Sequence, residues 1–324
     1  MVQKVATEKV KSNGAMKRQH AKAGLKPNLV VLADNARVPL KPKPRLRTNA
    51  DHEADAEKGV TECSAVCLQL RDLQRQRIVN LKSRIMIENR LVASIACMNG
   101  YQASMDEKER LARFDAARKA IKEVLEGDAH RETELCAAPL IRSASVAIDG
   151  FDQMVREYER QMVRLAKLLP VAAWVLKPEQ KGFGMLSLAV VVGEAGDLNN
   201  YANPGKLWKF MASAPYESDG VMKMPSTWRR EGGLSAAEWM EIGYNPRRRS
   251  IGYLIGENLV KQNGTGPYRQ RYDYAKARAA NTHADWKPLR CHRHGMLLAT
   301  KMIYLRLWCE WTGNDPNYVW RGIG

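Results

Sequence analysis

The chain has 324 residues, 45% of them hydrophobic, and carries 52 lysines and arginines against 35 acidic residues, a formal net charge of +17 at pH 7. This apolar content is enough for one large core or two modest ones, which excludes a chain that is disordered throughout, and the positive charge favours nucleic acid as a partner. The longest apolar run, around residues 186–192, is far shorter than the roughly 20 residues of a membrane span, so we expect no membrane segment.

Two features of the sequence, its N-terminal segment and its cysteines, bear on where the protein is located. The opening MVQKVATEKVK has no apolar stretch of the kind found in secretory signal peptides. The six cysteines are scattered along a long chain, as expected of free thiols in a reducing compartment. We therefore expect the protein to be cytoplasmic.

The first 58 residues combine a basic composition with one short apolar run. Lysine and arginine dominate the first fifty residues, in which Glu8 and Asp34 are the acids. Within them, residues 28–33 (NLVVLA) follow Pro27 and precede Asp34, the pattern of a buried strand. The sequence thus predicts a small strand-containing element and a basic linker.

Residues 59–175 have the spacing of long helices. From about Thr61 to Gly100, apolar residues recur three or four apart without proline, which indicates a coiled-coil-like helical arm. Further helices are predicted over residues 106–125 and 143–169, and the two long ones should pack antiparallel. The arginines of the first helix form either a solvated face or a phosphate-contacting face, and the pattern allows both.

Residues 176–324 are expected to form a helical domain that begins with a glycine turn. Lys181, Gly182 and Gly184 precede the apolar run at residues 186–192. A Gly-x-Gly turn at a helix N-terminus is the geometry by which helix-hairpin-helix elements hold a phosphate. A glycine turn between two packed helices explains the pattern equally well.

A segment that mixes aromatic residues with arginines follows and ends at Arg249. This composition suits stacking on bases and neutralisation of phosphates. Trp239 in this segment is equally well explained as a core residue. The arginines expected to contact nucleic acid are Arg229, Arg230, Arg247, Arg248 and Arg249, the last three of them at an exposed helix start after Asn245 and Pro246.

The chain ends in a short cluster of possible metal ligands and a helix. Cys291, His292 and His294 are too tightly spaced for a zinc site of the usual kind, and we expect no zinc there. Apolar residues then recur at helical spacing from Met296 to Trp311, which predicts an amphipathic helix.

Taken together, these landmarks resemble the IS-one-ten type of insertion-sequence transposase, the family of the pilin-gene invertases. Residues 181–198 and 214–220 are similar to the family blocks "G-x-G... L-x-x-E-x-G-D" and "P... S-S-G". Residues 70–91, with the cadence "LRxLxRxR... NRL", resemble its helical arm. Residues 29–37 and 51–56 resemble the end of its RuvC-like nuclease fold.

The resemblance implies a mainly α protein of three parts. Residues 1–58 would be the N-terminal remnant of an RuvC-like α/β domain with a basic linker, residues 59–175 the helical arm, and residues 176–324 a C-terminal transposase-like helical domain with a helix-hairpin-helix-like element. Because nothing in the sequence before Glu8 supplies the family's first strand and aspartate, we expect the nuclease-like part to be truncated at its N-terminus.

The resemblance also implies a metal site. Members of the family hold divalent metal with four acids in the order D, E, D, D; Asp55 matches the last of them, Asp51 the third and Glu8 the glutamate. Carboxylates neutralise and position such hard cations, so Mg²⁺ is the expected cofactor if this site is functional. Simple solvation in a polar linker is the other explanation for these acids.

A serine of the C-terminal domain is the nucleophile in that family. Ser218 lies in the block that matches "S-S-G", and Asp219 stands where the family has a serine. Ser213 is a further candidate, and Glu-Ser-Asp-Gly is also good turn chemistry. A serine that attacks a phosphodiester needs an activating base or metal and cationic groups around the phosphate.

The leading hypothesis is an insertion-sequence transposase or site-specific recombinase that binds DNA, is directed by a structured guide RNA as in the family, and acts as a homo-oligomer. The alternative is a catalytically inactive nucleic-acid-binding relative that has lost its metal site. A helical scaffold for protein partners is a third hypothesis, and it leaves the arginine-rich aromatic segment unexplained.

Overall fold

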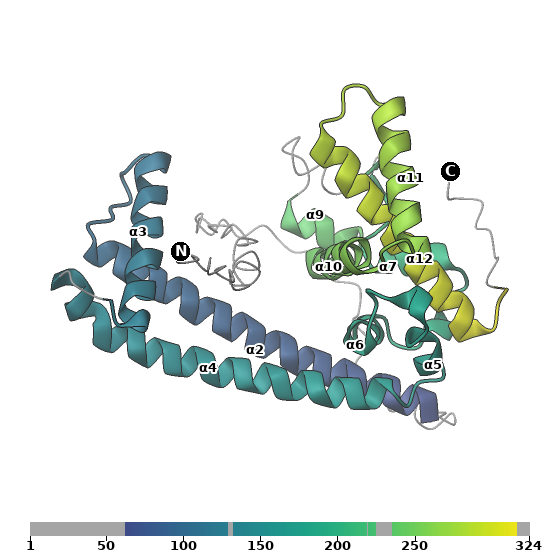
Figure 1. Ribbon diagram of the computed structural model, residues 1–324, viewed down its shortest axis with the longest axis horizontal. Helices are drawn as coiled ribbons and strands as arrows, with labels where there is room; N and C mark the ends of the chain where they lie inside the picture. Colours follow the sequence, from purple (N-terminus) through teal and green to yellow (C-terminus); the bar gives the residue numbers. More distant parts are fainter. Residues whose placement is uncertain (1–61, 129–131, 219, 225–234, 316–324) are drawn as a thin grey trace, which may run out of the picture. The chain divides into compact units, whose positions relative to one another are not determined.

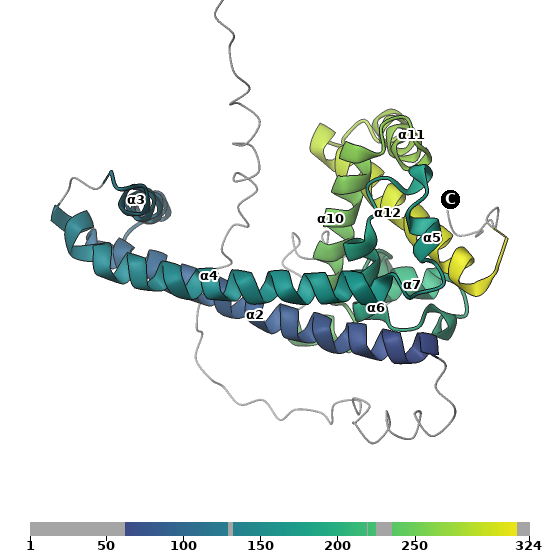
Figure 2. The same cartoon turned by 60° about the horizontal axis from the view of Figure 1, so that its bottom comes forward.

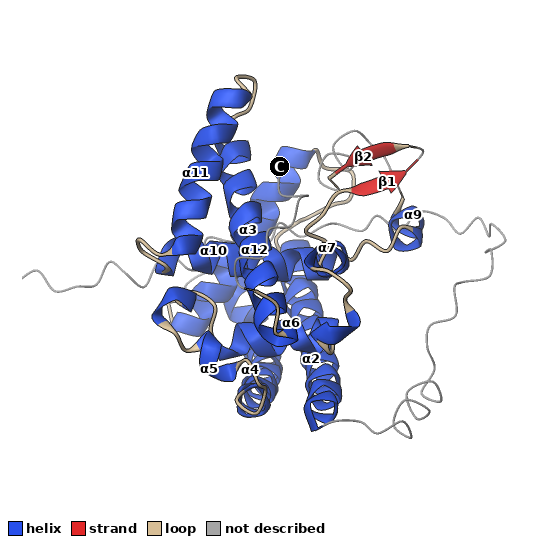
Figure 3. Ribbon diagram, turned by 90° about the vertical axis from the view of Figure 1, so that its right-hand side faces the viewer, coloured by secondary structure: helices blue, strands red, loops and turns tan. Residues whose placement is uncertain are grey.

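The structure is a computed structural model that describes residues 62–128, 132–218, 220–224 and 235–315. These residues are mainly helical, as Figures 1 and 3 show, so the helical fold class predicted from the sequence is confirmed for them. The chain divides into two units, Met1–Glu53 and Ala54–Gly324. The α/β remnant expected over residues 1–58, with its strand at residues 28–33, lies outside the described residues.

Two long antiparallel helices lie side by side (Figures 1 and 2). They are α2 (Glu62–Met98) and α4 (Glu132–Ala166). Arg77 of α2 pairs with Glu159 of α4 at 2.6 Å, and Arg84 pairs with Asp152 at 2.7 Å. The partner moves back along α4 as the arginine moves forward along α2, which fixes the antiparallel direction. Some of the basic face of α2 is therefore committed to ion pairs with α4.

The helix α4 starts earlier than the sequence predicted, at Glu132 rather than near residue 143. Pro139 lies inside the helix, where it removes a backbone hydrogen bond. Ala138 and Ile141 are buried in one apolar cluster with Ile95 of α2. Burial of this surface offsets the lost bond.

The helix α3 (Glu107–Glu126) confirms the prediction of a helix over residues 106–125. Its start is capped by Asp106, whose Oδ1 accepts the backbone N–H of Glu109 at 2.8 Å, and Gly127 ends it with a φ of 84°. Its buried face joins the apolar cluster between α2 and α4. The arm is thus a three-helix element at this end.

A second, larger core begins at the other end of the two long helices. It contains Leu70 of α2 and Met162 of α4 together with residues of α6 (Met185–Ala195) and α12 (Pro288–Thr312). The helix α6 is buried from Leu188 to Glu194, because its apolar run contacts α2, α4 and α10. One core therefore contains residues from both sides of residue 175, where the arm was expected to end.

The remaining elements range from single turns to helices of 16 and 17 residues. They are α5 (Ala172–Val175), the 3-10 helices η2 (Pro178–Gln180) and η3 (Leu198–Asn200), α7 (Pro204–Phe210), the antiparallel strands β1 (Tyr216–Ser218) and β2 (Val221–Lys223), α9 (Ala236–Glu241), α10 (Pro246–Gln262) and α11 (Pro267–Thr282). Proline occupies the first turn of α7, α10, α11 and α12, where its missing N–H costs nothing.

The last helix, α12, is more deeply buried than the predicted amphipathic stripe. It begins at Pro288, before the expected start at Met296, and it buries Ile303, Tyr304 and Leu307 as well as Leu305 and Trp308. Its contacts with α7, α10, α11 and η3 place it inside the core. No helix in the described part of the chain has both the length and the apolarity to cross a bilayer.

Candidate nucleic-acid interface

Glu194 ties three helices together. Arg247 of α10 binds its carboxylate with two bonds, from Nε to Oε1 at 3.0 Å and from Nη2 to Oε2 at 2.8 Å. Arg248 donates from Nε to Oε2 at 3.4 Å, and Gln74 of α2 donates from Nε2 to Oε1 at 3.0 Å. A single side chain of α6 therefore fixes the start of α10 against α2.

The charge of this carboxylate is stabilised by its partners. The Glu194 side chain is 2% exposed, and burial alone would raise its pKa. The hydrogen bonds from Arg247 and Gln74 and the charges of Arg247 and Arg248 outweigh that effect, so the pKa of Glu194 lies below its ordinary value of 4.5. Two guanidinium groups on one carboxylate leave an excess of positive charge at the start of α10, where the helix dipole is also positive.

The three consecutive arginines have different surroundings. The sequence predicted that Arg247, Arg248 and Arg249 all lie at an exposed helix start; the helix start is confirmed, but the exposure is wrong for Arg248 and Arg249, which are half-buried. The Arg248 guanidinium lies 3.7 Å from the centre of the Phe210 ring, and Arg249 donates to the carbonyl oxygen of Ala212 at 3.3 Å. Successive helical residues point about 100° apart, so three in a row cannot share one exposed face.

The strand β1 packs next to these arginines through Tyr216. Tyr216 is 1% exposed, its hydroxyl donates to the carbonyl oxygen of Lys209 at 2.5 Å, and its ring meets that of Tyr244 edge-on at 5.8 Å. Burial and the neighbouring Tyr244 raise the pKa of Tyr216 to about 12, against the opposing charges of Arg248 and Arg249. Tyr216 therefore anchors the hairpin beside the start of α10.

The two described candidate nucleophiles, Ser218 and Ser213, lie in different surroundings. Ser218 is the last residue of β1, two positions after Tyr216, and pairs with Val221 of β2; its backbone alone is described. Ser213 is 1% exposed, and its hydroxyl donates to the carbonyl oxygen of Met211 at 3.3 Å. Asp219, Arg229 and Arg230 lie outside the described residues.

The aromatic residues of the arginine-rich segment that are described belong to the core. Trp239 and Tyr244 are each 7% exposed and form a small cluster with Tyr216 and Ala212. Their rings lie 4.8 Å apart, centre to centre. The core explanation for Trp239 is therefore the one the structure supports, and Tyr244 offers no open face for a base. Figure 3 shows the hairpin and α9 close to each other.

The first glycine of the turn before α6, Gly182, is required by the packing of the turn against α10. Gly182 has a φ of 100°, and a Cβ there would lie 2.9 Å from both the Asn258 carbonyl oxygen and the Leu259 Cα of α10. Gly184 is exposed, with nothing within 4 Å of such a Cβ. Asn263 holds the turn by donating to the carbonyl oxygen of Lys181 at 2.9 Å. Lys181 and Gly184 face solvent, whereas Gly182 allows close contact between helices.

The structure does not describe the residues that were predicted to bind metal. Glu8, Asp51 and Asp55 lie outside the described residues. Among the residues that are described, no three histidines, cysteines or acids lie together as a metal site would require. His292 instead shares a hydrogen bond of 2.7 Å between its Nδ1 and the Tyr272 hydroxyl.

Comparisons with models of protein families, with curated proteins and with solved structures found no match to this chain. What the arrangement can do chemically therefore follows from its own charges and contacts. It offers an exposed guanidinium, Arg247, in a cluster with excess positive charge beside a hairpin that carries a serine. These groups suit contact with a phosphate.

Sequence reasoning missed the central role of Glu194 and Gln74. Glu194 is the lone acid in the apolar helix MLSLAVVVGEA, and an isolated acid in such a run signals a buried, paired carboxylate. No comparable signal identifies Gln74, because it lies in a helix rich in polar residues.

Proposed function

We propose that this protein is a DNA-binding recombinase of the insertion-sequence transposase kind, directed by a structured guide RNA. The observation that carries the proposal is the convergence on Glu194 of separate sequence blocks that resemble that family. Gln74 comes from residues 70–91, which resemble the arm, and Glu194 from the block "L-x-x-E-x-G-D"; Arg248, which also binds Glu194, comes from the arginine-rich segment that ends at Arg249. Convergence of these blocks in space supports a shared functional site.

The proposed site is the start of α10 together with the β1–β2 hairpin. Arg247 and its neighbours would bind phosphates of the DNA backbone, an interaction that positions the duplex without reading its sequence. Ser218 would act as the nucleophile on a phosphodiester held there, and the excess positive charge would stabilise the charge that develops on the phosphate. The family's chemistry also uses Mg²⁺, which Glu8, Asp51 and Asp55 would hold.

A nucleic-acid-binding relative without strand-exchange activity is the second candidate. Two observations favour it: Asp219 stands where the family has a serine, and the hydroxyl of Ser213 is buried on a backbone carbonyl. In that case the arginine cluster would keep its contact with phosphates, and Ser218 would be a turn residue of the hairpin.

One experiment separates the two candidates. Purified full chain is incubated with supercoiled plasmid, structured RNA and Mg²⁺ or Mn²⁺, and covalent protein–DNA adducts are resolved on denaturing gels. Adducts that disappear in Ser218→Ala and persist in the matched control Ser213→Ala support the recombinase. Salt-dependent DNA binding without adducts supports the binding-only candidate, and no DNA or RNA binding at low salt contradicts both.

A further inference from the structure

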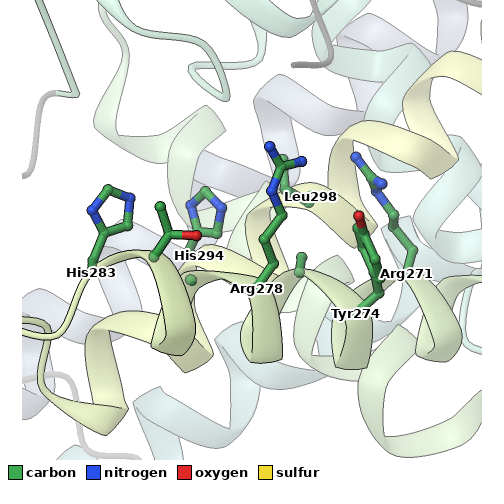
Figure 4. A pocket seen from close by; sticks show the side chains of 9 residues that line it. Arg271, Tyr274, Arg278, His283, His294 and Leu298 are labelled. Atoms are coloured by element: carbon green, nitrogen blue, oxygen red, sulfur yellow. The ribbon is translucent and has the colours of Figure 1, made fainter.

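A basic cavity lies between α11 and α12, away from the residues of the Glu194 site. It has a volume of about 170 Å³. Its polar wall consists of Arg271, Tyr274, Arg278, Thr282, His283 and His294, and no aspartate or glutamate lines it. Figure 4 shows the side chains of Arg271 and Arg278 extending to the same side of α11, with His283 and His294 beside them.

Helical spacing explains why α11 presents these groups together. Arg271, Tyr274, Arg278 and Thr282 recur at intervals of three and four residues, so they share one face of the helix. The adjacent face of the helix buries Tyr268 and Tyr272 in the protein. The other arginine of this helix, Arg269, is paired with Asp273 at 2.8 Å and does not line the cavity.

The histidine end of the cavity is held in place by Trp286. The His283 ring stacks on Trp286 at 4.1 Å with an interplanar angle of 12°, and the His294 ring meets Trp286 edge-on at 5.6 Å. Arg290 also lies over Trp286, at 4.0 Å. The imidazoles are therefore oriented before any ligand arrives, which lowers the entropic cost of binding.

The charged groups around His294 in the cavity are all positive. Burial lowers the pKa of His294, and the positive charges of Lys301, His283, Arg271 and Arg278 lower it further. These four groups face His294 from α11, from α12 and from the loop between them. An anion bound among them would reduce their mutual repulsion and would favour the protonated imidazole.

We propose that this cavity binds a phosphate group of a nucleic-acid backbone. Two arginines offer forked donors that match phosphate oxygens, and the two histidines add donors when protonated. The inference deepens the proposed function, because it rests on nucleic acid being the partner of the chain. It adds a contact surface on α11 and α12 that is separate from the arginines of α10.

The test measures binding of the full chain to a fluorescein-labelled DNA duplex at several KCl concentrations. Arg271→Gln and Arg278→Gln should each weaken binding by roughly tenfold and make the slope of log K against log salt shallower by about 0.9. The matched control is Lys276→Gln, which removes the same charge from the same helix at an exposed position outside the cavity wall. It should change the affinity less than twofold, as expected of a charge without a phosphate contact.

Three further measurements distinguish the possible outcomes of this test. Circular dichroism melting of every variant shows whether the helices remain folded, and Arg278→Lys should recover part of the affinity while keeping the charge. Equal affinities for Arg278→Gln and Lys276→Gln overturn the cavity proposal and leave the proposed function standing. If the wild-type chain binds no nucleic acid, the proposed function fails as well. Inorganic phosphate is then titrated while the His294 ring signals are followed by NMR, and a shift would assign the cavity to a free anion instead of nucleic acid.

Discussion

The indole N–H of Trp311 donates to Oδ1 of Asp197 at 2.9 Å, which ties the end of α12 to the turn that follows α6. The same oxygen accepts the backbone N–H of Asn199 at 2.9 Å. Asp197 is the aspartate of the block "L-x-x-E-x-G-D", so the conformation of this block depends on the final helix.

Replacing Asp197 should destabilise the fold rather than affect binding directly. Asp197→Ala removes the oxygen that accepts both hydrogen bonds and should lower the free energy of unfolding by about 1–3 kcal/mol, whereas Asp197→Asn keeps an acceptor oxygen and should lose less. Urea denaturation followed by circular dichroism measures both. Equal losses in the two variants would mean that the charge matters more than the hydrogen bonds.

Glu194→Gln should be costly, because it leaves two arginines of α10 without their carboxylate. Removing one partner of a buried ion pair costs about 3 kcal/mol or more, and the partial exposure of Arg247 places this site at the lower end of that range. The pKa of Glu194 is depressed in the folded state, so the carboxylate contributes stability above the ordinary pKa of 4.5 that is lost as pH falls through the folded pKa.

The acid part of a stability-against-pH curve checks this role of Glu194. Wild-type stability should fall as pH drops below about 4.5, and the fall should be smaller in Glu194→Gln. Glu107→Gln removes the same charge at an exposed position of α3 and serves as a control for the change in net charge. A Glu194→Gln curve parallel to the wild-type curve would show that the ion pair contributes no proton linkage.

The two glycines of the turn before α6 should respond differently to alanine. Gly182→Ala places a Cβ 2.9 Å from two backbone atoms of α10 at a φ of 100°, and we expect a loss of about 2 kcal/mol or more. Gly184→Ala meets open space and should change stability by less than about 0.5 kcal/mol. Thermal melting compares them; loss of DNA affinity in a fully stable Gly184→Ala would instead support the phosphate-binding interpretation of the turn.

Protonation of His294 should destabilise the free protein. Burial and then the surrounding positive charges hold its pKa below the ordinary 6.5, so the unfolded chain binds this proton more tightly than the folded chain. Stability is therefore full above pH 6.5 and decreases as pH falls through that value toward the folded pKa. His294→Gln should flatten the curve in this window, and the matched variant His283→Gln separates the effect of the half-buried ring from that of the exposed one.

Helical periodicity predicted much of the fold. The boundaries of α2, α3 and α6 follow the spacing of their apolar residues, since each helix buries a stripe or its whole surface. The helix α11 was not predicted, because its buried positions are Tyr268, Tyr272, Ala275 and Ala279. They recur every three or four residues, but tyrosine and alanine among charged residues give a weak hydrophobic signal.

The candidate site was less predictable than the fold. Three adjacent arginines gave a clear compositional signal, but their environments depend on Glu194, Phe210 and Ala212, which are distant in sequence. Contacts of this kind are set by tertiary packing and leave no local pattern. The basic cavity was missed for the same reason, because Arg278 and His294 come from two helices.

The shared core has a consequence for synthesis on the ribosome. Leu70 in α2 and Leu307 in α12 belong to one apolar cluster, although they lie far apart in the sequence. Leu207 and Trp208 of α7 belong to the same cluster, and α7 contacts α12. Their apolar surface thus emerges long before α12 can cover it, and such long-range contacts form slowly. During that interval the nascent chain displays an aggregation-prone surface, so its yield in cells should depend on chaperones that shield it until the last helix is made.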